Sequence, residues 1–144
     1  MRQILQHLGS GRTELAHVPA PGPAAGCVLI QATHSLVSLG TERMLVEFGR
    51  AGWLQKARQQ PERVRQVWQK IRAEGFLPAV QAIRSKLAQP IPMGYCSVGR
   101  VVAAPTRSDL SLGDRVVSNG PHAEVVSVAD GLVERIPDNV TDED

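Results

Sequence analysis

The side chains best suited to metal binding or nucleophilic chemistry are few and widely spaced in this sequence of 144 residues. The two cysteines, Cys27 and Cys96, are too few for a disulfide framework or for a zinc site of four thiolates. Nothing near Cys96 in the sequence would activate its thiol, so we interpret it as a small buried apolar residue. The histidines show no spacing typical of metal ligands, and we assign them no role: His7, His17, His34 and His122.

Two stretches of the chain, residues 1–40 and 93–137, have patterns typical of β-strands. The run 27–32 is short, apolar and flanked by turn residues, as expected for a buried strand. Short apolar runs predict further strands at residues 98–102, 115–117, 123–128 and 132–136. Such short strands with turn residues between them predict a small antiparallel barrel.

The stretch between these two, residues 44–90, has helical spacing instead. Val64, Val67, Trp68 and Ile71 fall on one face of a helix. A second helix is expected to begin at Pro78, and a third is expected over residues 44–57, although glycines interrupt it. The sequence therefore predicts a mainly β domain with a helical insert at about 44–90.

Composition and charge exclude several classes of protein. Hydrophobic residues make up 42% and charged residues 21% of the chain, which is typical of a globular domain. Only 3% of residues are aromatic, which argues against a module that stacks nucleic-acid bases. No apolar run approaches the length of about 20 residues that spans a bilayer, and no signal peptide is recognisable. A cytoplasmic location is the expectation.

The charge is unevenly distributed. Residues 45–90 contain nine basic and three acidic residues, a net charge of +6, whereas the rest of the chain carries −4. A basic surface of this kind could attract anionic substrates, or could simply be the solvated face of amphipathic helices.

Four short segments occur in the same order as in one known family. They are Ser-Leu-Gly-Thr-Glu at 38–42, Gly-Tyr-Cys-Ser-Val-Gly-Arg-Val at 94–101, Leu-Gly-Asp-Arg-Val at 112–116, and Ala-Glu-Val-Val at 123–126 with Ile-Pro-Asp-Asn-Val at 136–140. Together they resemble the GroES-like amino-terminal domain of the medium-chain dehydrogenases/reductases. The resemblance covers about residues 1–43 and 93–144, and it implies a GroES-like β-barrel. The alternative is an unrelated small β-barrel.

The departures from the family pattern concern its catalytic zinc. The resemblance places Leu39, Tyr95 and Cys96 where the zinc-dependent branch has its Cys, His and Glu ligands. Leucine has no atom that can ligate a metal, and the family's lobe of four closely spaced cysteines is missing. The resemblance is therefore to a zinc-binding dehydrogenase-like subgroup that lacks the zinc ligands.

Without zinc, hydrogen-bond donors would have to polarise a carbonyl or protonate an enolate. The resemblance makes Tyr95 the first candidate, because it stands where a ligand would face the substrate; the competing interpretation is a packed barrel tyrosine whose hydroxyl the backbone satisfies. Thr41 stands in the place of the family's proton-relay hydroxyl. We favour Thr41 as a helix N-cap, since threonine is a preferred cap and a helix is expected to begin there.

The cofactor is expected on another domain. No glycine-rich G-x-G-x-x-G segment follows a predicted strand, so no Rossmann domain is expected within the chain. The resemblance implies NAD or NADP bound by a nucleotide-binding domain on the same or a companion chain. The 144 residues alone are expected to bind no cofactor and to have no turnover.

The substrate expected from the resemblance is a small carbonyl compound or an activated alkene. The long insert and Gly-Tyr-Cys resemble a bacterial subgroup of oxidoreductases, which suggests a sugar or nucleotide-sugar. Two alternatives stay open: a non-catalytic binding or assembly module, and a nucleic-acid binder that uses the basic insert, against which the low aromatic content and the acidic barrel count. The sequence leaves the oligomeric state open, a homo-oligomer included.

Overall fold

The computed structural model describes residues 1–51 and 88–142, and five residues between them: Glu62, Arg65, Gln69, Gln81 and Ser85. The chain divides into two compact units. The first comprises Met1–Leu5, Glu14–Glu42 and Pro92–Asp144, and the second comprises Gln6–Thr13 and Arg43–Ile91. The first unit carries most of the strands and all of the residues discussed below as a site.

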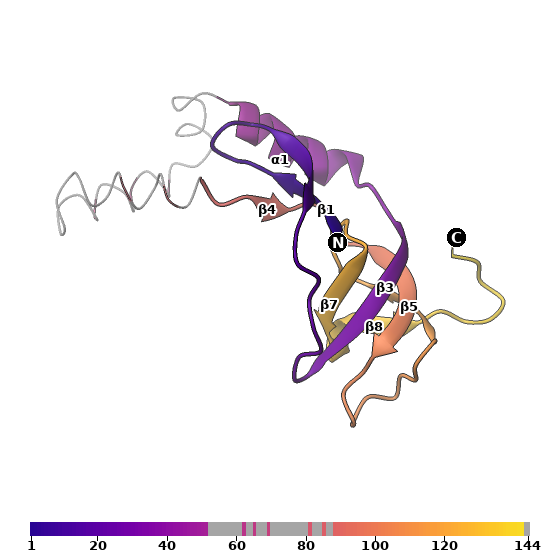
Figure 1. The fold of residues 1–144 in the computed structure, drawn as a ribbon. Coiled ribbons are helices and arrows are strands. Elements are labelled where there is room, and N and C mark those ends of the chain that lie inside the picture. The colour runs from indigo at the N-terminus through magenta and orange to yellow at the C-terminus, as the bar shows by residue number, and fades with distance from the viewer. Residues whose placement is uncertain are drawn as a thin grey trace. The chain divides into compact units, whose positions relative to one another are not determined.

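The described elements are mainly strands, as Figure 1 shows. In chain order they are β1 (Arg2–Gln6), β2 (Thr13–His17), β3 (Cys27–Ser35), α1 (Leu39–Arg50), β4 (Ile91–Pro92), β5 (Ser97–Ala103), β6 (Arg115–Ser118), β7 (Val125–Ala129), a short 3₁₀ turn (Asp130–Leu132) and β8 (Val133–Arg135). The strands form a three-stranded sheet in the order β2-β1-β4 and a five-stranded sheet in the order β7-β3-β5-β6-β8.

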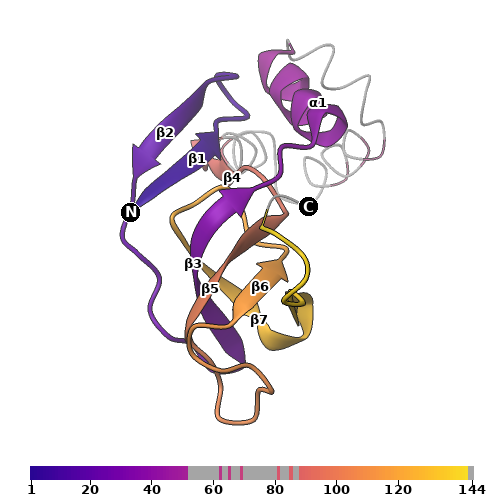
Figure 2. The ribbon, with the colours of Figure 1, turned by 90° about the vertical axis from the view of Figure 1, so that its right-hand side faces the viewer.

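Strand β3 lies between β7 and β5 in the five-stranded sheet, and it pairs antiparallel with both (Figure 2). Its last residue, Ser35, lies opposite Ser97, the first residue of β5. Register shifts interrupt this pairing twice, the second time between Ala32 and His34. An irregular ladder of this kind bends a strand and redirects its side chains, so the end of β3 is placed differently from a regular strand.

The core of the first unit consists of β-branched side chains from five strands. Val28 and Ile30 on β3 are fully buried, as the apolar run in this part of the sequence predicts. The remaining buried members of the cluster come from β5, β6, β7 and β8: Val101, Val116, Val126, Val128 and Val133. Branched side chains pack well on a pleated surface, and burying each one contributes about 1.5–3 kcal/mol.

Helix α1 begins earlier than predicted. It runs from Leu39, rather than from residue 44, to Arg50, and residues 52–57 of the predicted helix lie outside the described residues. The early start has a local cause, since the Glu42 N–H donates to the Ser38 carbonyl and the Glu42 carboxylate accepts the Ser38 N–H, each at 2.9 Å. Ser38 is therefore the residue at the cap, and the assignment of Thr41 as N-cap was wrong. Thr41 lies inside the first turn.

Glycine is tolerated at position 49 of α1 because another segment of the second unit packs closely against it. A Cβ atom at Gly49 would lie 2.7 Å from the Gln6 amide nitrogen and 3.1 Å from the Gly11 Cα. Any larger residue would therefore separate the helix from the segment Gln6–Thr13 of the same unit. The interruption seen in the sequence is thus a close approach of backbone rather than a break in the helix.

The predicted class, a mainly β fold with a helical insertion, is confirmed. The predicted helices around Val64–Ile71 and after Pro78, and most of the basic residues of the insert, lie outside the described residues. Among the residues that are described, no helix has the length and apolar character needed to cross a membrane.

We predict that Gly99→Ala destabilises the fold by about 1–3 kcal/mol, the usual cost of forcing extra volume into a packed site. The added Cβ would lie 2.3 Å from the Gln31 carbonyl oxygen and 2.9 Å from the Ala32 Cα, both of which are backbone atoms. Urea unfolding measures the effect. Gly131→Ala is the control, because its Cβ meets no atom within 4 Å. Equal stability of the two variants would contradict the close β3–β5 approach.

Candidate functional site

A buried carboxylate lies at the start of α1, at the end of the segment that follows β3. The Glu42 side chain is 10% exposed, and its Oε1 accepts the Ser38 backbone N–H at 2.9 Å. The same residue donates its own N–H to the Ser38 carbonyl. These two reciprocal bonds fix the first turn of the helix, in the manner of a capping box in which a carboxylate reaches back to the cap residue.

The second partner of Glu42 is His122, from the loop between β6 and β7. Its Nε2 lies 3.1 Å from each carboxylate oxygen of Glu42, and its side chain is 5% exposed. An ionised carboxylate only accepts hydrogen bonds, so Nε2 carries the proton in this contact. The pair joins residues 80 positions apart in the chain.

The other ring nitrogen of His122 faces the end of β3. Nδ1 lies 2.8 Å from the hydroxyl of Ser35, which is an exposed residue. A hydroxyl both donates and accepts, so Ser35 satisfies Nδ1 whether or not that nitrogen carries a proton. The backbone of His122 is held as well, because its N–H donates to the Met93 carbonyl at 2.7 Å and its carbonyl accepts the Ile4 N–H at 2.9 Å.

Gly94 packs directly against the His122 imidazole. A Cβ at position 94 would lie 2.7 Å from three ring atoms of His122, namely Cδ2, Cγ and Nδ1. Gly94 also has a φ of +85°, a conformation that side chains disfavour. Both constraints select glycine at the residue that immediately precedes Tyr95.

Tyr95 is the most accessible reactive group in this region, with 49% of its surface exposed. The side-chain hydroxyls of Ser38 and Thr41 are close enough to the Tyr95 hydroxyl to change its pKa. These hydroxyls can donate to the phenolate, and they lower the pKa of Tyr95, Ser38 having the larger effect and Thr41 the smaller. Partial burial and the negative charge of Glu42 act in the opposite direction.

The segment that leads into α1 presents apolar side chains to solvent. Leu36, Val37 and Leu39 are 66%, 57% and 80% exposed. The Leu36 N–H donates to the Cys96 carbonyl at 3.0 Å, so this segment runs beside the residue that follows Tyr95. Polar hydroxyls and exposed apolar side chains therefore occur together, which is the usual composition of a surface that binds an organic ligand.

The structure brings together the two site residues that the sequence singled out, Tyr95 and Thr41. It also adds Ser38, Glu42 and His122, to which the sequence gave no role. Glu42 lay within the 38–42 segment, but nothing in the sequence indicated its partner. Among the described parts of the chain, no three His, Cys, Asp or Glu side chains are grouped as they would need to be to hold a metal ion.

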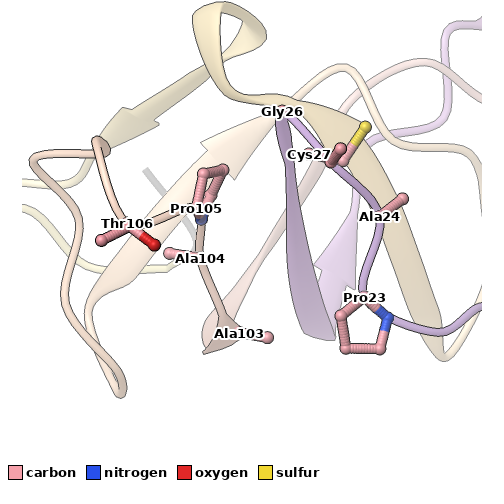
Figure 3. Close-up of a pocket in the computed structure, with 9 residues that line it drawn as sticks. Pro23, Ala24, Gly26, Cys27, Ala103, Ala104, Pro105 and Thr106 are labelled. Atoms are coloured by element: carbon pink, nitrogen blue, oxygen red, sulfur yellow. The ribbon is translucent and has the colours of Figure 1, made fainter.

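A separate apolar hollow of about 250 Å³ lies at the opposite end of the β3–β5 ladder (Figure 3). One wall is the segment that enters β3, with Pro23, Ala24 and Cys27, and the other is the segment that leaves β5, residues 103–106. The hollow is roughly 25 Å from the Ser35 end of β3, at about 3.3 Å per residue. It contains no ion pair and is not part of the Tyr95 site.

We predict that Ser38→Ala and Thr41→Ala each raise the pKa of Tyr95, with Ser38→Ala having the larger effect, because each removes a donor to the phenolate. Tyr95 is the only tyrosine in the chain, so tyrosinate absorbance during an alkaline titration reports on this residue alone. Tyr95→Phe abolishes the signal and serves as the control. Unchanged titration curves in both alanine variants would contradict the hydrogen-bonded arrangement.

We also predict that Gly94→Ala is more destabilising than Gly113→Ala. The two glycines have nearly equal φ values, +85° and +86°, so alanine meets the same backbone strain at both positions. Only Gly94 faces a buried side chain, and its clash with His122 adds about 1–3 kcal/mol. Thermal or urea unfolding of the two variants measures the difference. If both lose equal stability, Gly94 does not pack on the imidazole as described.

The sequence matches no protein-family model and no curated protein, but the fold is found in solved structures. A probable oxidoreductase from Mycobacterium abscessus shares 20% identity with a TM-score of 0.64, and the match covers 99% of this chain and 37% of that one. A quinone oxidoreductase of Escherichia coli, solved in complex with NADPH, shares 12% with a TM-score of 0.62, over 99% and 35% of the two chains. The corresponding enzyme of Thermus thermophilus shares 18% with a TM-score of 0.56, over the same fractions.

These similarities concern the fold, since the identities are low. The chain spans between 35% and 37% of the length of those three proteins. Over that part its fold is similar to the fold of those three oxidoreductases, in agreement with the fold expected from the four sequence segments.

Proposed function

We propose that this chain is the substrate-side domain of an NAD(P)-dependent oxidoreductase, in which the Tyr95 hydroxyl donates a proton to the substrate. The observation that carries the proposal is the accessible Tyr95 phenol, which is held by the side chains of Ser38 and Thr41. The likeness to NADPH-binding oxidoreductases over a third of their length supports it.

In this proposal the chain handles the proton. When a carbonyl carbon accepts a hydride, negative charge develops on its oxygen, and a donor at that oxygen stabilises the charge and then protonates it. Tyr95 supplies the donor, and the Ser38 and Thr41 hydroxyls stabilise the tyrosinate that remains. Because Tyr95 is half exposed, solvent can return the proton afterwards.

A nicotinamide cofactor would supply the hydride, and we expect it to bind outside the Tyr95 site. Dinucleotide sites place a glycine-rich turn and a helix N-terminus against a pyrophosphate. Helix α1 instead has the buried carboxylate of Glu42 in its first turn, and this negative charge would repel a phosphate. The cofactor would therefore bind to a nucleotide-binding domain, on the same or a companion chain.

The residue types support a zinc-independent reaction. Leu39 is 80% exposed beside the Tyr95 hydroxyl cluster, where the resemblance would place a thiolate ligand, and an isobutyl group cannot bind a metal. Hydrogen bonding by Tyr95 would take over the polarising role that a metal has in the zinc-dependent branch.

Two substrate classes fit the proposal to different degrees. Exposed Leu36, Val37 and Leu39 favour an apolar carbonyl compound, such as a quinone, because they would lose contact with water on binding it. The sequence resemblance favours a sugar or nucleotide-sugar, but the described site offers few polar groups beyond Ser38, Thr41 and Tyr95 for its hydroxyls. We propose the apolar carbonyl first.

We predict that joining the chain to its nucleotide-binding domain produces NADH or NADPH binding that the 144 residues alone lack, measured by calorimetry. In the joined enzyme, Tyr95→Phe should lower kcat by about 10²–10⁴-fold, the range for loss of a general acid. Leu112→Ala is the matched control, because Leu112 is an exposed apolar residue in the loop before β6.

Full turnover by Tyr95→Phe would refute the role of Tyr95. Cofactor binding by neither form would favour the alternative, a non-catalytic binding module with the same fold. Turnover by the isolated chain with NAD(P)H would refute the need for a second domain.

A further inference from the structure

His122 contacts both segments that form the Tyr95 site. On one side, its Nε2 lies 3.1 Å from both oxygens of Glu42, which in turn holds the Ser38 N–H at 2.9 Å. On the other side, its ring is covered by Gly94, the residue before Tyr95. These contacts link Ser38, in the segment that starts α1, through Glu42 and His122 to Gly94, the residue before Tyr95.

The placement of Tyr95 against its hydroxyl partners depends on two chain segments far apart in sequence. Ser38 and Thr41 belong to the turn that starts α1, whereas Tyr95 belongs to the loop before β5. The first turn of α1 is exposed on its outer side, since Leu39 is 80% exposed. Glu42 is the buried residue of that turn, and its side chain contacts Ser38 and His122.

We propose that His122, acting through Glu42 and Gly94, is a positioning residue that holds the Ser38 and Thr41 hydroxyls against the Tyr95 hydroxyl. His122 itself lies beneath the site, 5% exposed, and does not contact substrate. Its backbone bonds to Met93 and Ile4 anchor it to the strands of the first unit. The effect of His122 on catalysis rests on the proposed function, whereas its effect on Tyr95 is tested by titration and does not.

The charge of Glu42 and its positioning of Ser38 predict opposite changes in the pKa of Tyr95 when Glu42 is replaced. The carboxylate repels a tyrosinate and so raises this pKa. If Glu42 acts through its charge alone, removing the carboxylate lowers the pKa of Tyr95. If Glu42 instead positions Ser38, its removal releases the hydroxyl partners and raises the pKa of Tyr95. The single tyrosine of the chain makes this sign measurable without any turnover.

The first experiment uses two amides that each replace one nitrogen of the imidazole. The His122→Gln amide reaches the Nε2 position and keeps a donor to Glu42, whereas the His122→Asn amide reaches only the Nδ1 position, next to Ser35. We expect His122→Asn to raise the pKa of Tyr95 towards that of Ser38→Ala, and His122→Gln to restore the wild-type titration. Ser35→Ala, which removes only the Nδ1 contact, should titrate as wild type. Circular dichroism checks that each variant is folded.

The second experiment keeps the proposal testable if His122→Asn does not fold. Glu42→Gln retains an oxygen that accepts the Ser38 N–H, so it should lower the pKa of Tyr95 by removing the charge. Glu42→Ala removes both charge and acceptor, and we expect it to raise that pKa. A fall in both Glu42 variants would overturn the proposal, as would wild-type titration of a folded His122→Asn.

The role of Tyr95 as the acid and the role of His122 as a positioning residue can be refuted separately. If the titrations follow this pattern but Tyr95→Phe retains full turnover in the joined enzyme, His122 positions a tyrosine that is not the acid. If Tyr95→Phe is inactive but the titrations are flat, Tyr95 is the acid and His122 does not position its partners.

Discussion

The contact between Glu42 and His122 is the interaction on which the arrangement of the site depends. A carboxylate taken out of water loses several kcal/mol of solvation, which only well-placed donors recover. Glu42 has two such donors, the Ser38 backbone N–H and His122 Nε2, which lies at the same distance from both carboxylate oxygens. Removing either partner would leave a buried polar group unsatisfied, which costs more than the contact contributes when it is intact. The pair therefore constrains where the first turn of α1 can lie.

The buried Glu42–His122 pair supports the exposed side chain of Tyr95 and the hydroxyl groups beside it. Tyr95, Ser38 and Thr41 are accessible hydroxyl groups, and alone they would be free to take other rotamers. Gly94 restricts them further, because its contact with the imidazole fixes the backbone that enters Tyr95. Functional groups need this kind of support, since a donor displaced by an ångström no longer stabilises the charge for which it is placed.

The five-stranded sheet contributes by bringing distant segments to one end. Because β3 pairs with both β5 and β7, its last residue, Ser35, lies beside the start of β5 and within reach of His122. The opposite end of the same ladder carries only the apolar hollow around Cys27. The contact between Glu42 and His122 thus lies at the end where β3 leads into α1, and this is the part of the fold that the proposed function uses.

The sequence by itself determined the strands, the mainly β class and the two residues, Tyr95 and Thr41, that meet in the site. Strand periodicity and short motifs are local properties, and they survive in a single sequence. It did not determine the start of α1, because a hydrogen bond from Ser38 to a carboxylate four residues later outweighs the glycine in that turn. Nor did it determine the role of His122, whose partner is 80 residues away and whose selection depends on burial, on Gly94 and on the pairing of β3. Such contacts are decided by tertiary structure, because only folding sets the distance between segments that no local pattern relates.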